Sequence, residues 1–161
     1  MDALRIIRAD LDDPEHQAAV LEMTRDYARD PMGNGGDLSD DVLEVLIPRL
    51  RTHPTTRIFL AFDGKEPVGI ATCFIGFSTF AARPLINIHD LHVTADHRRR
   101  GIGRRLLQAV EEDARELDCC KITLEVQENN RPALSLYGSF GFVGGQYQAE
   151  AGGVLFREKR L

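Results

Sequence analysis

The sequence has few cysteines, no long apolar run and no excess of basic residues. Its three cysteines, Cys73 and the adjacent pair Cys119 and Cys120, form neither a disulfide framework nor a CxxC metal motif, so we expect reduced thiols and no bound metal. No apolar stretch approaches the ~20 residues that a membrane span needs. Residues 1–5 lack the basic start and apolar run of a signal peptide, which favours a cytoplasmic protein.

The charge balance is acidic and disfavours one class of partner. The net charge of -5 argues against a general nucleic-acid binder, because phosphate binding needs a basic face, and it is compatible with a cationic substrate. The length of 161 residues fits one domain, which we place at 1–161. The composition, 43% hydrophobic and 28% charged, is that of an ordinary globular protein.

Hydrophobic periodicity predicts a mixed α/β domain. Strand patterns occur at 4–8, 58–62, 68–77, 85–93, 122–126, 142–147 and 154–159. Helical spacing or helix-start residues predict helices at 13–27, 39–50, 102–117 and 131–138. The helix at 102–117 has the strongest 3.6-residue period. The segment 30–37, with two glycine-rich steps and a proline, is expected to be a loop.

The segment 98–104, Arg-Arg-Arg-Gly-Ile-Gly-Arg, joins the strand at 85–93 to the helix at 102–117. Such a strand-to-helix turn can bind phosphate, because a helix N-terminus offers unpaired backbone N–H groups and a partial positive charge. Gly101 and Gly103 let a phosphate approach the backbone closely. Arginines at 98–100, 104 and 105 add attraction for an anion.

Simpler explanations remain open for this segment. Two glycines separated by one residue often mark only a tight turn, and a run of arginines is usually a solvated surface patch. A non-specific nucleic-acid patch is a third explanation, which the acidic balance elsewhere disfavours. The segment is neither a Walker A loop, since Gly-Lys-Ser/Thr is absent, nor the GxGxxG of a dinucleotide-binding fold.

The surrounding spacing resembles that of the GNAT N-acetyltransferases. Their signature, Arg/Gln-x-x-Gly-x-Gly/Ala, is matched by Arg98, Gly101 and Gly103. The segment 91–93 precedes it at the usual distance, and a second family feature follows downstream at Asn130, Ala133, Leu136-Tyr137 and Phe140-Gly141-Phe142. The resemblance implies an acyl-CoA N-acyltransferase fold, with a central, mostly antiparallel sheet, splayed parallel strands and flanking helices. It also implies an acetyl-CoA-dependent acyltransferase of class EC 2.3.1.

Carried over residue by residue, the resemblance implies a cofactor between two splayed strands, which end at Val93 and Val126. The arm of coenzyme A would pair with the backbone of Leu91 and Val93 as an extra strand would, and backbone N–H groups at 99–104 would hold the pyrophosphate. Many relatives carry glycine where this chain has Arg99. The implied cofactor-binding residues are Leu91, His92, Val93, Arg98, Arg99, Arg100, Gly101, Ile102, Gly103, Arg104, Asn130, Ala133 and Tyr137.

Acetyl transfer to an amine needs a base for the ammonium proton and an acid for the departing thiolate. Tyr137 resembles the family's tyrosine acid by its position seven residues after Asn130. The alternative reading of Tyr137 is a core-edge aromatic on a short helix. Asn130 is alternatively the N-cap of that helix. For Tyr137 and for Asn130, the structural role is compatible with the functional one.

The strand at 85–93 supplies the candidates for the base. Period-two alternation puts Asn87, His89, Leu91 and Val93 on one face unless a bulge intervenes, so that His89 points toward the acetyl end. Imidazole is a common general base near neutral pH. The alternatives are a partly exposed strand histidine with no catalytic role at 89, or a base at Asp90, at His92 or on a water molecule.

The segment 88–93 is similar to the corresponding strand of spermidine/spermine and thialysine acetyltransferases. Those relatives have glutamate at the His89 position and then aspartate, which Asp90 matches, and the stretch 77–80 also resembles that group. The implied acceptor is the primary amine of a small molecule, such as a polyamine or diamine. The alternatives are a protein N-terminal or lysine acetyltransferase and a non-catalytic acyl-CoA-binding module. Since dimers are common in the family, a homodimer is a further expectation.

Overall fold

The computed structural model describes residues 4–144, 150, 152 and 154–161. It divides the chain into two compact units, Met1–Gln127 and Glu128–Leu161. The expectation of one domain at 1–161 therefore stays a prediction.

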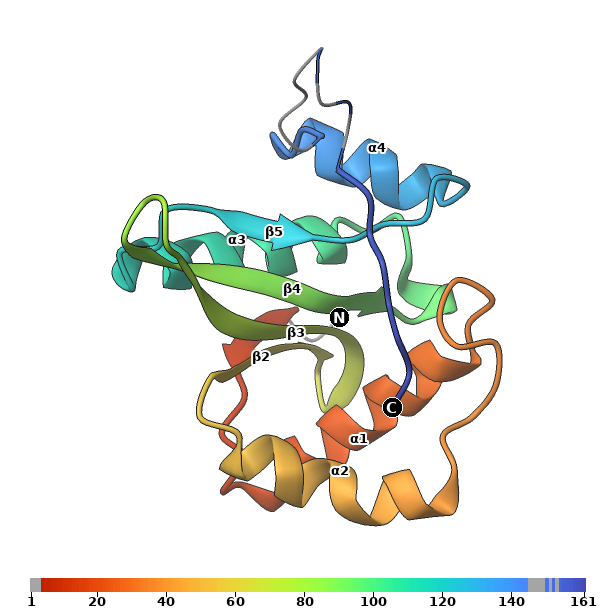
Figure 1. Ribbon diagram of the computed structural model, residues 1–161. Helices are drawn as coiled ribbons and strands as arrows, with labels where there is room; N and C mark the ends of the chain where they lie inside the picture. Colours follow the sequence, from red (N-terminus) through yellow and green to blue (C-terminus); the bar gives the residue numbers. More distant parts are fainter. Residues whose placement is uncertain (1–3, 145–149, 151, 153) are drawn as a thin grey trace. The chain divides into compact units, whose positions relative to one another are not determined.

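A five-stranded mixed sheet forms the centre of the first unit (Figure 1). The first four strands pair antiparallel and the fifth pairs parallel to the fourth, so the predicted fold class is confirmed. In sheet order, which is also chain order, the strands are β1 (Arg5–Arg8), β2 (Thr56–Asp63), β3 (Glu66–Ser78), β4 (Arg83–Val93) and β5 (Ile122–Leu124).

The helices of the first unit are α1 (Pro14–Arg29), α2 (Asp40–Thr52) and α3 (Ile102–Glu116), with the short 3-10 helix η1 (Ala95–His97) before α3. α1 begins where the sequence predicts, because Asp13 accepts a hydrogen bond from the backbone N–H of Glu15 at 2.8 Å and Pro14 occupies the first turn. Ser39 is the N-cap residue of α2, as expected, but its side chain makes no capping hydrogen bond.

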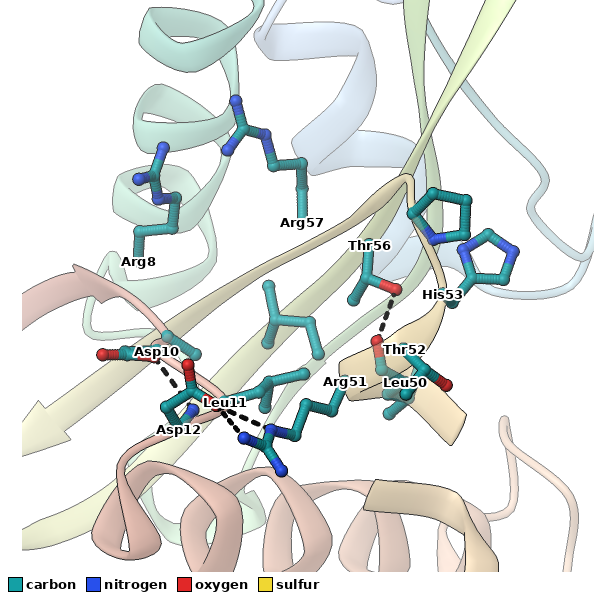
Figure 2. Close-up of a pocket in the computed structure, with 13 residues that line it drawn as sticks. Arg8, Asp10, Leu11, Asp12, Leu50, Arg51, Thr52, His53, Thr56 and Arg57 are labelled. Atoms are coloured by element: carbon teal, nitrogen blue, oxygen red, sulfur yellow. Dashed lines mark hydrogen bonds and ion pairs between the residues drawn. The ribbon is translucent and has the colours of Figure 1, made fainter. Parts of the chain in front are cut away.

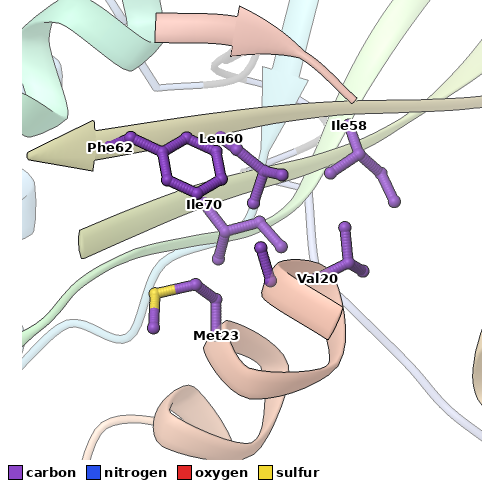
Figure 3. Packing of buried hydrophobic residues seen from close by; sticks show 7 residues of the cluster. Val20, Met23, Ile58, Leu60, Phe62 and Ile70 are labelled. Carbon is purple, nitrogen blue, oxygen red and sulfur yellow. The ribbon is translucent and has the colours of Figure 1, made fainter. Parts of the chain in front are cut away.

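α1 covers one face of the sheet. Its residues Val20 and Met23 are buried against a layer of strand side chains (Figure 3). That layer consists of Ile58, Leu60, Phe62 and Ile70. Removing these side chains from water is the main stabilisation of the α1 layer, at about 1.5–3 kcal/mol for each large residue.

α3 covers the opposite face. A Cβ atom on Gly69 would lie 3.2 Å from Leu106 and 3.3 Å from Ile102, so α3 packs directly on β3 at this residue. Successive strand residues point to opposite faces, and Ile70, which follows Gly69, faces α1. The predicted 3.6-residue period is confirmed by the buried positions of α3, which are Ile102, Leu106, Leu107, Val110, Asp113 and Ala114.

The second unit contains α4 (Arg131–Ser139), close to its predicted range. The strand predicted at 154–159 is wrong, since these residues have no regular secondary structure. Val154, Leu155 and Phe156 are all exposed, so no buried face selects a strand there. Of the strand predicted at 142–147, residues 142–144 are irregular and 145–147 lie outside the described residues.

Candidate functional site

β4 and β5 pair over a short distance and then part. Their register joins Ile86 to Ile122 and ends with Ile88 opposite Leu124, where β5 stops. β4 continues to Val93, so residues 89–93 have no strand beside them on that edge within the described part of the chain. These are the two strands that were expected to splay, although β5 ends at 124 rather than 126.

The backbone groups of Leu91 and Val93 point toward this open edge. The N–H of Thr94 donates to the carbonyl of Val68 at 3.0 Å, which makes Val93 and Gly69 a non-hydrogen-bonded pair of the antiparallel ladder. Because hydrogen-bonded and non-hydrogen-bonded pairs alternate along the ladder, Leu91 and Ala71, two residues further along, also form a non-hydrogen-bonded pair. Residues in such pairs direct their N–H and C=O groups away from the partner strand. Leu91 and the N–H of Val93 can therefore pair with an added extended chain, whereas the carbonyl of Val93 already accepts a hydrogen bond from Nε of Arg98.

A β-bulge at His89 changes which side chains share a face. The β3–β4 register joins Cys73 to Ile88 and then Thr72 to Asp90, so His89 is an extra residue on β4. The expectation that 87, 89, 91 and 93 share one face is therefore wrong. A bulge was the exception to this alternation, and because of it Asn87 no longer shares a face with Leu91 and Val93.

After the bulge, Asp90 and His92 lie on the face covered by α1. Nε2 of His92 is 2.6 Å from Oδ2 of Asp26 in α1, and the ring of Tyr27 packs against the His92 ring with 5.2 Å between centroids. His92 is only 5% exposed. The His92 side chain is thus bound to α1, and its implied contact with the cofactor stays a prediction.

The remaining candidates for the base differ in exposure. Burial raises the pKa of Asp90, and electrostatic interactions with His89 and His92 oppose that shift. His89 is exposed, its ring lies 5.8 Å from that of Phe74, and it is the first residue of β4 beyond the last β4–β5 pair. His89 therefore combines access with a position at the point where the strands part.

The turn between β4 and α3 contains two residues in the left-handed region, Arg99 at φ 61 and Gly101 at φ 76. Gly101 is the N-cap residue of α3, with no side-chain capping bond and no acidic residue in the first helical turn. None of the hydrogen bonds found among the described residues uses the backbone N–H groups of 99–103. Left-handed residues in a turn gather successive N–H groups into a concave anion-binding surface.

Arg99 adopts the conformation that suits the glycine of many relatives. A non-glycine residue in the left-handed region is strained by on the order of 1 kcal/mol. Arg99 thus has a backbone conformation that glycine adopts without this strain.

The side chain of Arg98 binds β4 and α1. Its Nε donates to the carbonyl of Val93 at 3.0 Å, and its Nη2 forms an ion pair with Oδ2 of Asp30. Burial acts to raise the pKa of Asp30, but hydrogen bonds from Arg98 and from the N–H of Met32 outweigh it and hold that pKa below its usual value. The guanidinium of Arg98 is thus occupied by two protein partners.

The predicted site residues Asn130, Ala133 and Tyr137 belong to the second unit. Asn130 caps α4 by accepting a hydrogen bond from the backbone N–H of Ala133 at 3.3 Å, which confirms its structural alternative. The ring of Tyr137 packs edge-on against Phe142 with 5.8 Å between centroids. The cofactor and acid roles of these residues stay predictions.

Sequence reasoning missed Asp26 and Asp30 of the α1 region. No local motif marks them, because their partners His92 and Arg98 are distant in the chain. Their spacing of four residues, which puts them on one helix face, was the available signal.

A pocket of about 750 Å³ is lined by the end of β1, the loop before α1, the end of α2 and the start of β2, and it contains none of the predicted site residues (Figure 2). Its arginines are paired with carboxylates. Arg51 binds Asp12, and Arg57 and Arg8 approach Asp113 at 3.3 and 3.6 Å. These pairs neutralise the arginines, so the pocket offers an anion little attraction.

Within the described residues, no group of three or more His, Cys, Asp or Glu side chains is suited to a metal ion. The helices of that part of the chain are too short or too polar to cross a bilayer.

An open strand edge leading into an N–H-lined turn defines a protein that can hold an extended, phosphate-bearing ligand. The sequence model described as the acetyltransferase (GNAT) family matches residues 20–142, and this chain belongs to that family. The sequence resemblance is thereby confirmed, and acetyl-CoA is the co-substrate of the family.

Individual relatives cover part of the chain. A thialysine N-epsilon-acetyltransferase of Caenorhabditis elegans is 31% identical over 85 residues, which are 53% of this chain and 52% of that protein. An N-alpha-acetyltransferase 30 of Xenopus laevis is 36% identical over 85 residues, or 53% of this chain and 31% of that protein. This chain thus spans about half the length of the first relative and less of the second.

Two solved structures share the fold over 98% of this chain. An aminoglycoside acetyltransferase from an uncultured soil metagenomic sample has a TM-score of 0.80 at 21% identity and covers 98% of this chain and 96% of its own. A probable acetyltransferase has a TM-score of 0.78 at 24% identity, covering 98% and 99%. At these identities the likeness shows the fold alone.

Proposed function

We propose that this protein transfers the acetyl group of acetyl-CoA to a primary amine of a small molecule of the polyamine or diamine kind. The observation that supports this most is the turn at 99–103, whose N–H groups lead into α3 directly after the open edge of β4. A diphosphate suits this turn, because both a helix N-terminus and left-handed turn residues favour negative charge. The arm of the coenzyme would pair with β4 at Leu91 and Val93.

The acceptor must lose a proton before it can attack. An alkylammonium with a pKa of ~10.4 requires roughly 4 to 5 kcal/mol for deprotonation at pH 7. We assign the base to His89, which is exposed at the bulge. The neutral amine nitrogen attacks the thioester carbon, the C–S bond breaks, and Tyr137 gives its proton to the departing thiolate. The acetylated nitrogen then releases its second proton, which returns Tyr137 to the neutral phenol and leaves the amide. Asp90, which follows His89 and is partly buried, and a water molecule are the alternative bases.

Charge and similarity support the acceptor class. The net charge of -5 suits a cationic acceptor, and the relative named a thialysine acetyltransferase favours a small amine. The relative named an N-alpha-acetyltransferase favours a second candidate, the amino terminus of a protein. A non-catalytic acyl-CoA-binding module is the alternative outside enzymes.

Calorimetry with coenzyme A and turnover of acetyl-CoA test these alternatives together. The acceptor panel contains spermidine, 1,3-diaminopropane, thialysine and peptides with free amino termini or lysines. We expect binding of coenzyme A and turnover of the small amines. Turnover of peptides alone would favour the second candidate, and binding without any turnover would favour the module. No heat of binding with an intact fold would refute the proposal.

The role of His89 has a matched control. The rings of His89 and His53 both lie against Phe74, at 5.8 and 5.2 Å. His89→Gln should lower kcat by about 10²-fold with an unchanged Kd for coenzyme A, whereas His53→Gln should leave kcat unchanged. Equal kcat values in both variants and in the wild type would remove His89 as the base.

We further propose a cytoplasmic homodimer that needs no metal and binds neither nucleic acid nor membranes. Light scattering on a sizing column, cell fractionation, and activity in the presence of a chelator test these points. A monomer in solution, or loss of activity with the chelator, would contradict them.

A further inference from the structure

The C-terminal end of α1 holds the segment that leads from β4 into the cofactor turn at 99–103. Asp26 binds Nε2 of His92 at 2.6 Å. Asp30, the C-cap residue of α1, forms the ion pair with Arg98. Two carboxylates four residues apart on the α1 side thus bind an imidazole and a guanidinium six residues apart on the segment between β4 and α3.

Arg98 has a fixed orientation. A guanidinium presents its donors in a rigid planar fork, so the two contacts of Arg98, with the Val93 carbonyl and with Asp30, leave it little freedom. Asp30 is itself held, because its side chain is 14% exposed and accepts the N–H of Met32 at 2.9 Å. A rigid link therefore runs from the end of α1 to the residue that precedes the turn.

The turn needs such a support. Arg99, the next residue, has a φ of 61, and strained conformations of this kind persist only where their surroundings hold them. We propose that Asp30 is a positioning residue for the coenzyme A site, because through Arg98 it holds the turn at 99–103 in its anion-binding conformation. This inference rests on the proposed function, since it concerns the same turn.

The test compares Asp30→Asn with Asp37→Asn. Asp37 lies on the loop after α1 and binds Arg25 and Arg29 at 2.7 and 2.6 Å, with no contact to the turn. Asp30→Asn should raise the Kd for coenzyme A about tenfold, since it weakens one charge-assisted hydrogen bond at a partly exposed arginine. The KM for acetyl-CoA should rise in step, with kcat changed less than about twofold. Asp37→Asn should leave the Kd unchanged.

A second variant covers the case in which Asp30→Asn does not fold. Arg98→Lys keeps the charge but lacks the fork that reaches Val93 and Asp30 together, so the Kd should rise by a similar factor. Wild-type Kd values in a folded Asp30→Asn or Arg98→Lys variant, or equal losses in Asp30→Asn and Asp37→Asn, would overturn the inference. All of these outcomes presuppose that the wild-type protein binds coenzyme A, so they would overturn only the role of Asp30. If the wild-type protein itself did not bind coenzyme A, the proposed function would be refuted.

Discussion

Gly101→Ala is expected to weaken coenzyme A binding while the protein stays folded. Gly101 has φ +76, where an L side chain costs about 1–2 kcal/mol, and no atom lies within 4 Å of the position of an added Cβ. Backbone strain alone therefore opposes alanine. Alanine also reduces the entropy of the unfolded chain, which offsets about 0.4–1 kcal/mol. The net loss of stability is on the order of 1 kcal/mol, or about 2–4 °C in Tm.

The chain can relieve this strain if residue 101 leaves the left-handed region. The N–H groups of the turn would then no longer point to one side, and a bound diphosphate would lose at least one charge-assisted hydrogen bond. Such a bond contributes about 1.5–3 kcal/mol, so the Kd for coenzyme A should rise about tenfold or more. Isothermal titration calorimetry measures the Kd, and thermal unfolding followed by circular dichroism measures Tm.

Gly35→Ala is the matched control. Gly35 has φ +70 and also has no atom within 4 Å of an added Cβ, but it lies in the loop between α1 and α2. The control should show the same fall in Tm and an unchanged Kd. A Gly101→Ala variant that binds coenzyme A like the wild type, or a Gly35→Ala variant that loses binding equally, would refute the reasoning.

Other properties of the chain can be tested in the same preparation. Tyr137→Phe should lower kcat by about 10²-fold with an unchanged Kd for coenzyme A; an unchanged kcat would exclude the acid role. Burial raises the pKa of Asp90 in the folded state above its unfolded value of ~3.9. The ionised carboxylate therefore destabilises the folded state at pH values above the folded-state pKa, and this effect disappears below the unfolded value. Asp90→Asn should therefore raise Tm at pH 7, with the gain vanishing toward pH ~4; a constant gain would contradict this. Burial also raises the pKa of the Cys73 thiol, which should react with a thiol reagent only after unfolding, whereas the partly exposed Cys119 and Cys120 should react in the native protein.

The helices that the sequence predicted well have local causes, whereas the parting of two strands was predicted from the family resemblance. The period of α3 depends on side chains within the helix, and its start depends on the conformation of Gly101. The parting of β4 and β5 was predicted through the family resemblance, since nothing in the composition of either strand requires it. The start of α1 at Asp13 and Pro14 also follows from neighbouring residues alone.

The features that the sequence did not predict depend on distant partners. The contacts of Asp26 and Asp30 join α1 to residues more than sixty positions away, and no local pattern encodes such pairs. The predicted strand at 154–159 failed because alternation stabilises a strand only when one face is buried, and Phe156 is exposed.

The bulge depends on the pairing of two strands, and it determines which of the polar side chains near the end of β4 is exposed. In a regular strand, His89 would point to the α3 face together with Val93. Asp90 and His92 would point to the α1 face, as they do in the structure. The extra residue separates His89 from this alternation and leaves it exposed where β4 and β5 part. Asp90 and His92 remain on the α1 side, the first partly buried and the second bound to Asp26. Because His89 is the unpaired residue of the bulge, it is exposed to solvent, whereas Asp90 and His92 lie on the face that packs against α1.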